Sequence, residues 1–244
     1  MKKYLINQIL KLKIVKKTQD YLKTRARVQN EILKGLIFNN TICDSEWLKY
    51  KSFSPGLWAA DYGLLYTLYR VLNGIKPNNV LEFGLGQSSK MLHQYGNFFH
   101  ANVVTCEHDE SWIRFFNEGR DGKYDVNIKK LELESIIYNG FETLSYKDII
   151  KEIGNIKYDL IIVDGPFGSK HFSRPQIIEL SQKCLADSFC IIMDDTHREG
   201  EMETAIEVQR VLKDLGVNYC STTYSSSKKH TLICSPDLNF LTSL

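Results

Sequence analysis

The residues best suited to acid–base or metal chemistry follow two apolar runs in the second half of the chain. They are Asp164, after residues 160–163, and Asp194, Asp195, His197 and Arg198, after residues 189–193. Three carboxylates at one edge of a sheet repel each other unless a cation, a proton or an arginine compensates their charge. We predict that these five residues form a catalytic site, with His197 as a general base and Arg198 as an anion clamp. The alternative is that the acids cap loops and that the histidine and arginine belong to a surface loop.

A loop earlier in the chain has the pattern of a nucleotide-cofactor site. Gly84 and Gly86 follow the apolar run 80–83. Glycines directly after a strand let the backbone turn tightly and approach a ligand closely. Glu107 ends the next apolar run, where a carboxylate can accept hydrogen bonds from both ribose hydroxyls of an adenosine. Together these features favour a nucleotide cofactor over a turn that uses glycine for packing alone.

Two kinds of nucleotide cofactor use such a loop. The fingerprint of a nicotinamide dehydrogenase, G-x-G-x-x-G, requires a glycine at position 89, where the chain has Ser89. The pattern acid-x-G-x-G, typical of S-adenosylmethionine methyltransferases, is satisfied by residues 82–86. The loop therefore favours S-adenosylmethionine over a nicotinamide.

The elements that must position these residues alternate along the chain. Short apolar runs at residues 80–83, 103–106, 160–163 and 189–193 predict strands, separated by segments long enough for crossover helices. This alternation predicts a parallel sheet. The ligand-binding edge of such a sheet lies at the carboxyl ends of its strands, where the acids stand.

Other segments predict the remaining elements. Residues 127–137 suggest one additional strand, and residues 217–224 and 231–234 predict an antiparallel hairpin. Residues 57–72 have helical periodicity, with Ser54-Pro55 as a start signal. The aromatic residues Trp112, Phe115 and Phe116 lie at helical spacing and are expected to pack in the core.

From about residue 58 to its end the chain resembles the class I S-adenosylmethionine-dependent methyltransferase family. The resemblance rests on Glu82-Phe83-Gly84-Leu85-Gly86, on Val163-Asp164-Gly165-Pro166 with Gly168 and Arg174, and on Asp194-Asp195 with Arg198. Ser88 stands at the position of the third family glycine. The resemblance implies an α/β fold with a Rossmann-like, doubly wound, seven-stranded sheet that ends in an antiparallel hairpin.

The resemblance also assigns roles to residues. The cofactor-binding residues that it implies are Glu82, Gly84, Gly86, Gln87, Ser88, Glu107, His108 and Asp164. Metal-dependent small-molecule O-methyltransferases place an acid after the fourth strand and an acid–amide pair after the fifth, and Asp195 replaces that amide here. Two mechanisms stay open. Asp164, Asp194 and Asp195 hold Mg²⁺ or Mn²⁺, or an aspartate takes the proton, assisted by His197, while Arg198 or Arg174 holds an anionic part of the acceptor.

The function implied is methyl transfer from S-adenosylmethionine to an oxygen, less readily a nitrogen, of a small-molecule or sugar-related acceptor such as a polysaccharide. One alternative is an aminopropyl-type transferase that uses the decarboxylated cofactor and binds an amine through acidic residues. Another alternative is a non-catalytic module that keeps the cofactor fold and binds a partner or a membrane through basic helices. Loss of cofactor binding would favour that module.

The first 34 residues are strongly basic. They hold ten Lys or Arg against two acidic residues, whereas the rest of the chain holds 21 basic and 27 acidic residues. We predict a helical extension over residues 1–50 and a methyltransferase domain over residues 51–244. The extension either caps the domain, contributes to a homodimer or contacts an anionic membrane through residues 1–45. Nucleic acid is not expected, because aromatic residues are sparse among the basic ones and the rest of the chain is acidic.

Composition supports a globular protein. Hydrophobic residues make up 43% and charged residues 25% of the chain, which is ordinary for a globular domain. The six cysteines form no C-x-x-C pair, so a zinc ribbon is excluded and reduced, mostly buried thiols are expected. No run of 18 apolar residues occurs. These features predict a cytoplasmic protein, peripheral to the inner face of a membrane if the extension binds lipid.

Overall fold

The computed structural model describes residues 2–56, 59–120, 122–153 and 156–244, with side chains from residue 15 onward. Its helices are α1 (Lys2–Ile42), α2 (Tyr62–Ile75), α3 (Gln87–Phe99), α4 (Glu110–Arg120), α5 (Ile149–Ile153), α6 (Gln176–Lys183), α7 (Glu199–Asp214) and the 3₁₀ segment η1 (Pro236–Ser243). Its strands are β1 (Asn79–Phe83), β2 (Asn102–Glu107), β3 (Ile128–Lys130), β4 (Leu133–Tyr138), β5 (Phe141–Tyr146), β6 (Tyr158–Val163), β7 (Leu185–Met193), β8 (Cys220–Ser225) and β9 (Lys229–Cys234).

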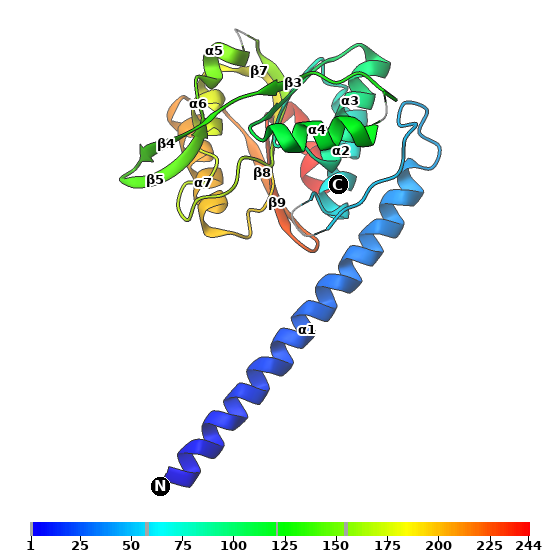
Figure 1. Cartoon of the computed structure of the whole chain (residues 1–244). Helices are drawn as coiled ribbons and strands as arrows, with labels where there is room; N and C mark the ends of the chain where they lie inside the picture. The colour runs from blue at the N-terminus through cyan, green and yellow to red at the C-terminus, as the bar shows by residue number, and fades with distance from the viewer. Residues whose placement is uncertain (1, 57–58, 121, 154–155) are drawn as a thin grey trace.

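Seven of these strands form one twisted sheet in the order β3-β2-β1-β6-β7-β9-β8 (Figure 1). The pairs from β3 to β7 are parallel, whereas β9 is antiparallel to both β7 and β8. The predicted seven-stranded doubly wound sheet and its C-terminal hairpin are therefore confirmed. β9 is inserted between β7 and β8, so its first residues lie at the edge where β7 ends.

The sheet separates two apolar layers, because successive side chains of a strand point to opposite faces. Val80 and Ile162 pack on one face with α2, α3 and η1. Leu81 and Ile161 pack on the other face with α5, α6 and α7. The four consecutive apolar residues at the end of β6 are all buried, as expected for a parallel strand covered on both sides.

Two boundary predictions were wrong. The segment 127–137 is not one strand: β3 ends at Lys130 on the edge of the main sheet, and β4 starts a separate hairpin with β5. The helix predicted over residues 57–72 begins at Tyr62, because Asp61 accepts a hydrogen bond from Leu64 N at 2.8 Å and caps it. Leu57 and Trp58, at the start of the predicted helix, lie outside the described residues.

The aromatic group on α4 also differs from the expectation. Phe116 is buried, but Trp112 and Phe115 are 41% and 62% exposed and stack on each other with ring centroids 5.2 Å apart. Helical spacing alone could not separate these cases, because only one side of this helix contacts the domain.

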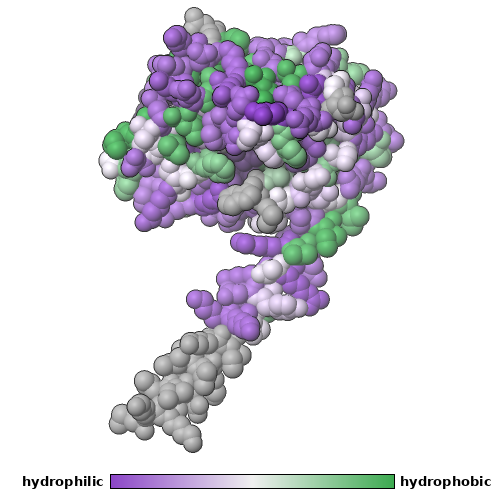
Figure 2. Space-filling model, viewed as in Figure 1, coloured by the Kyte–Doolittle hydropathy of each residue, from purple (hydrophilic) through white to green (hydrophobic). Residues whose placement is uncertain are grey.

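The basic extension is one long helix that projects from the domain (Figure 1). Its last turns contact α2 through buried Phe38 and Ile42, and Glu31 Oε1 accepts a hydrogen bond from Tyr62 N at 2.8 Å. The helix therefore does not cap the domain along its length. Figure 2 shows a hydrophobic patch on the part of the helix next to the domain. Among the helices described, none combines the length and apolar content that a membrane-spanning segment needs.

The cysteines match the expectation of free, mostly buried thiols. All six are unbridged, and Cys106, Cys184, Cys190 and Cys234 are buried. Burial raises the pKa of the Cys106 thiol to about 12, so this side chain behaves as a neutral, small apolar group. The core accordingly needs no disulfide.

Candidate functional site

The candidate site lies at the carboxyl edge of the sheet, where β1 is flanked by β2 on one side and β6 on the other. Open α/β sheets bind ligands at such a point, where the strand order reverses. Backbone hydrogen bonds bring the strand ends together: Asp164 N donates to Phe83 O at 2.8 Å, and Asp194 N donates to Val163 O at 3.0 Å. The predicted glycine loop and the predicted acids are thus neighbours.

The two glycines of the loop have different environments. Gly84 has φ of +93°, and a Cβ there would lie 2.6 Å from the carbonyl oxygen of Asp164. Gly84 is therefore required by the chain's own backbone. A Cβ at Gly86 would meet no atom within 4 Å. Of the two loop glycines, Gly86 is therefore the one whose backbone faces open space, as close approach by a ligand requires.

Glu82 lies beneath this loop and is fully buried. Its Oε2 accepts hydrogen bonds from Ser89 Oγ and Thr105 Oγ1, both at 2.7 Å. Burial raises the pKa of Glu82 to about 7, although these hydroxyl donors act in the opposite direction. Ser88 is a third hydroxyl that acts on this carboxylate and lowers its pKa, so the buried acid is held by side chains of the chain itself.

Glu107, at the end of β2, ties the loop to the neighbouring strand. Its Oε2 accepts from Leu85 N at 3.0 Å, and its Oε1 accepts from the backbone N–H of His108 at 2.7 Å and of Asp109 at 3.0 Å. Trp112 Nε1 donates to Leu85 O at 2.6 Å, so the partly exposed Trp112 ring also contacts the loop. The acid thus sits beside the glycine loop as predicted, and its role toward a ribose stays a prediction.

Gln87 and Ser88 begin α3 directly after the loop. The side-chain oxygen of Gln87 accepts a hydrogen bond from Ser54 N at 3.0 Å, which fastens the segment before α2 to the loop. Ser88 is buried, and its hydroxyl acts on the Glu82 carboxylate, where it lowers the pKa of that acid. Both residues thus serve contacts within the chain at the start of α3.

The three aspartates converge as predicted. One carboxylate oxygen from each of Asp164, Asp194 and Asp195 lies within 4.8 Å of the others. Asp194 and Asp195 are buried, and the Asp164 side chain is 13% exposed. Neither carboxylate oxygen of Asp194 accepts a hydrogen bond within the described part of the chain. The cluster therefore depends on charge compensation.

Three cationic side chains of the chain itself supply that compensation. Lys228 Nζ lies 3.6 Å from Asp194 Oδ2 and 3.4 Å from Asp195 Oδ1. Arg174 Nη2 lies 3.2 Å from Asp195 Oδ2 and 3.7 Å from Asp164 Oδ1, and Arg198 Nη1 lies 3.1 Å from Asp195 Oδ2. Arg198 Nη1 also lies 3.4 Å from Oε1 of buried Glu201, so the three cations are shared among four carboxylates in a largely buried volume.

The charges divide the aspartates into two kinds. Burial, reinforced by the neighbouring Asp194, raises the pKa of Asp164 well above its ordinary value. Burial, reinforced by Asp195, raises the pKa of Asp194 to about 6. Burial also acts to raise the pKa of Asp195, but Lys228 and the two arginines outweigh it, so this pKa is lowered. Asp195 is therefore the acid of the cluster that stays ionised most readily, whereas Asp164 and Asp194 are a coupled pair whose pKa values are both raised.

Lys228 is the site residue that sequence reasoning missed. It lies in the turn between β8 and β9, where Asp61 Oδ2 accepts hydrogen bonds from its backbone N–H at 2.9 Å and from Ser227 Oγ at 3.0 Å. Its Nζ also donates to Ala59 O at 3.0 Å. The signal that could have found it is the hairpin itself, because an antiparallel strand beside β7 must begin at the edge where β7 ends.

The predicted Mg²⁺ or Mn²⁺ does not fit this cluster. Lys228 already bridges Asp194 and Asp195, and Arg174 reaches Asp164 and Asp195. A divalent ion beside these carboxylates would face three cationic side chains at short range, and their repulsion would offset its attraction to the acids. Proton transfer without a metal is the chemistry that these residues support.

The remaining predicted residues differ in accessibility. Arg174 is buried, and its guanidinium donates to Pro166 O, Val163 O, Asp194 O and Asp195 Oδ2. It is therefore part of the scaffold and is not available to hold an acceptor. His197 is exposed over much of its surface. Partial burial of its side chain nevertheless lowers its pKa, and the charges of Arg198 and Lys228 act in the same direction. A neutral His197 at the rim can accept a proton.

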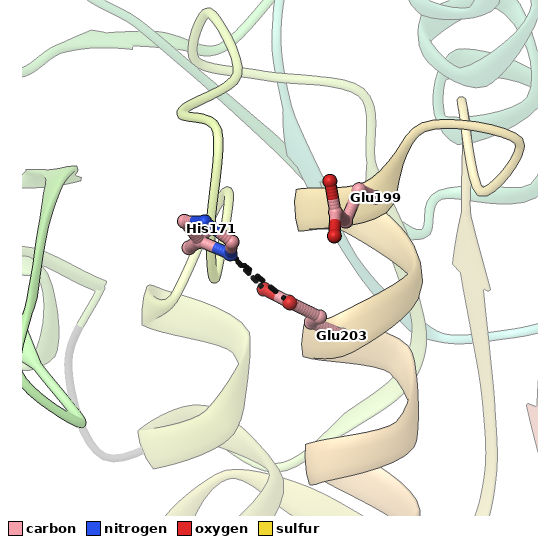
Figure 3. Close-up of side chains that lie close together, drawn as sticks. All are labelled: His171, Glu199 and Glu203. Atoms are coloured by element: carbon pink, nitrogen blue, oxygen red, sulfur yellow. Dashed lines mark hydrogen bonds and ion pairs between the residues drawn. The ribbon is translucent and has the colours of Figure 1, made fainter.

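A second cluster of metal-ligating residue types joins the loop after β6 to the start of α7. Figure 3 shows His171, Glu199 and Glu203 close together, with the histidine directed toward Glu203. His171 Nδ1 lies 3.1 Å from Glu203 Oε1, and Phe172 N donates to Glu203 Oε2 at 3.1 Å. These contacts anchor the loop that carries the residues after Asp164.

Comparisons with known proteins identify the fold. No protein-family profile matches the chain, and no curated protein is significantly similar in sequence. A precorrin-6y C5,15-methyltransferase from Geobacter metallireducens is 11% identical with a TM-score of 0.50, over 75% of this chain and 93% of that chain. A putative caffeoyl-CoA O-methyltransferase from Staphylococcus aureus is 14% identical with a TM-score of 0.49, over 91% of this chain and 99% of that chain. A methyltransferase from Pyrococcus furiosus is 15% identical with a TM-score of 0.46, over 84% of this chain and 97% of that chain. The chain thus has the fold of the class I S-adenosylmethionine-dependent methyltransferases.

Proposed function

We propose that this protein is an S-adenosylmethionine-dependent methyltransferase that methylates an oxygen of a small-molecule or sugar-related acceptor. The observation that carries the proposal is the close backbone contact between Gly84 and Asp164, which joins the loop that is open at Gly86 to Asp164 and Asp194, two acids whose pKa is raised by burial. S-adenosylmethionine would supply an electrophilic methyl group at this edge. The fold supports the proposal by analogy alone, since one fold serves many activities.

The residues at the loop fit an adenosyl cofactor. Gly86 offers backbone that a ligand can approach, and Glu107 lies beside it at the end of β2. Glu82 lies beneath the loop and accepts hydrogen bonds from Ser89 Oγ and Thr105 Oγ1. These buried hydrogen bonds hold the start of α3 beside the open backbone at Gly86.

The carboxylate pair favours a hydroxyl acceptor. A hydroxyl must lose its proton when it is methylated, and a group with a pKa near the working pH accepts that proton efficiently. Asp164 is the member of the pair that reaches the surface, whereas Asp194 lies behind it with no exposed side chain. Asp164 therefore meets the acceptor, and Asp194 and Lys228 set its protonation.

The same charges disfavour the aminopropyl alternative. A cationic amine substrate needs carboxylates with unspent charge, but Asp195 is already paired with Arg174, Arg198 and Lys228. A second ammonium at this site would add a fourth cation. An oxygen acceptor without positive charge is compatible with this balance.

Calorimetry with S-adenosylhomocysteine tests the proposal without requiring the acceptor. Gly86→Val should lose measurable binding, because its side chain fills the space over the loop. Gly119→Val is a matched control, since Gly119 is exposed on α4 and a Cβ there also meets open space. Equal affinity in both variants, or tight binding of NAD to the unmodified protein, would sink the assignment.

A further inference from the structure

Helix α1 carries a row of exposed apolar side chains that the domain does not use. Their exposed fractions run from 39% to 65%, and they are Val15, Tyr21, Leu22, Val28, Ile32, Leu33, Leu36 and Ile37. Single exposed apolar residues are ordinary on a protein surface, but a contiguous apolar face marks an interaction site. The hydrophobic patch on the helix in Figure 2 is the end of this face nearest the domain.

The apolar face points away from the domain. Val15, Leu22 and Leu36 are separated by multiples of seven residues, which is close to two helical turns, so they share one side of the helix. Phe38 and Ile42, which are buried against the domain, lie on a different side. A flat surface can therefore contact the apolar face along the helix while the domain stays behind it.

The helix is also basic: a row of cations that includes Lys34 lies toward the domain, where Lys34 Nζ is 5.3 Å from the centre of the Tyr66 ring, and Arg25, seven residues before Ile32, lies within the apolar face. The described side chains of α1 include six cations against Asp20 and Glu31: Lys16, Lys17, Lys23, Arg25, Arg27 and Lys34. Lys16 and Lys23, and likewise Arg27 and Lys34, are seven residues apart and follow the helix as a row. An α-helix is about 10–12 Å across with its side chains. The row therefore stays within about one Debye length of any surface that the apolar face touches.

We propose that α1 docks on an anionic lipid surface, lying in the interface with its apolar face toward the acyl chains. Charge complementarity selects this occupant, because an apolar face bordered by cations attracts anionic headgroups. Docking would hold the site at a membrane surface, independently of what the site methylates.

Co-sedimentation of the full chain with vesicles tests the proposal. We expect binding to phosphatidylcholine–phosphatidylserine vesicles, weaker binding at high salt and little binding to phosphatidylcholine alone. Leu33→Asp combined with Leu36→Asp should weaken binding at least about tenfold, because two carboxylates enter the apolar face. Lys16→Glu combined with Lys23→Glu should weaken it through charge alone.

Ile206→Asp combined with Leu215→Asp is the matched control. Both residues lie on the domain and are 58% and 55% exposed, similar to Leu33 and Leu36. This control should bind vesicles as the unmodified chain does. The proposal is overturned if the unmodified chain does not sediment with anionic vesicles, or if the α1 and control variants bind equally. It is also overturned if sedimentation equilibrium shows a dimer that Leu33→Asp with Leu36→Asp dissociates, which would assign the face to a second copy. None of these readouts depends on cofactor binding.

Discussion

Replacing Lys228 by methionine should destabilise the protein in a pH-dependent way. The Lys228 ammonium lies 3.4 to 3.6 Å from carboxylate oxygens of Asp194 and Asp195. At an effective dielectric constant of about 20, each of these attractions amounts to about 5 kcal/mol before desolvation. Removing one partner of a buried ion pair costs about 3–5 kcal/mol net. We expect Lys228→Met to lower the free energy of unfolding by about 3 kcal/mol at pH 8.

The cost should be smaller at low pH. The pKa of Asp194 in the folded protein, about 6, lies above that of an unfolded aspartate. The folded state therefore holds more protons, and this group's contribution to stability falls as pH rises through about 6. Without Lys228 the pKa of Asp194 rises further, so the fall continues above pH 6. At about pH 5, where Asp194 is largely protonated in both proteins, about half of the cost should remain.

Urea denaturation at the two pH values measures the effect. Lys229→Met is the matched control, because Lys229 is the exposed next residue, at the start of β9, and it should change stability by less than about 0.5 kcal/mol. A cost for Lys228→Met that is the same at both pH values would refute the coupling to Asp194. A cost no larger than that of Lys229→Met would refute the compensation of the cluster by Lys228.

Three further outcomes follow from the same structure. Gly84→Ala should destabilise by at least about 2 kcal/mol in thermal denaturation, because its Cβ would meet the Asp164 carbonyl and its φ is positive, whereas Gly86→Ala should be nearly neutral; equal stability of the two variants would contradict this. In the unmodified protein, burial raises the folded pKa of Glu82 to about 7, so the free energy of unfolding should fall by up to about 3 kcal/mol as pH rises from about 4.5 through about 7. Glu82→Gln should abolish this fall. An unchanged profile of stability against pH in the variant would argue against this. Asp164→Asn and Asp194→Asn should each lower turnover at least about 10²-fold with cofactor affinity unchanged. EDTA should leave the turnover of the unmodified protein unaffected. Near-normal turnover in both variants, or loss of activity in EDTA, would overturn the metal-free mechanism.

Much of the fold could be predicted from local sequence patterns. The apolar runs ending at Phe83, Cys106, Val163 and Met193 each became a buried strand, because a parallel strand covered on both faces needs consecutive apolar residues. The positions of Asp164 and Asp194 followed from the same rule, since a residue directly after such a strand lies at its carboxyl edge. The terminal hairpin was predictable because its turn is too short for a helix.

Tertiary packing decided the electrostatics of the site and the course of the chain's ends. Lys228 meets Asp194 only because β9 is inserted antiparallel beside β7, and Arg174 is buried in the scaffold whereas Arg198 stays partly exposed. Similarly, β3 and β4 separate within one continuous stretch, and α1 leaves the domain after its last turns. The physical reason is the separation along the chain of the groups that interact. Strand and helix periodicity reflects the burial of residues that are close in sequence. Charge compensation joins groups tens of residues apart, and how the layers pack decides which of these charged groups come into contact.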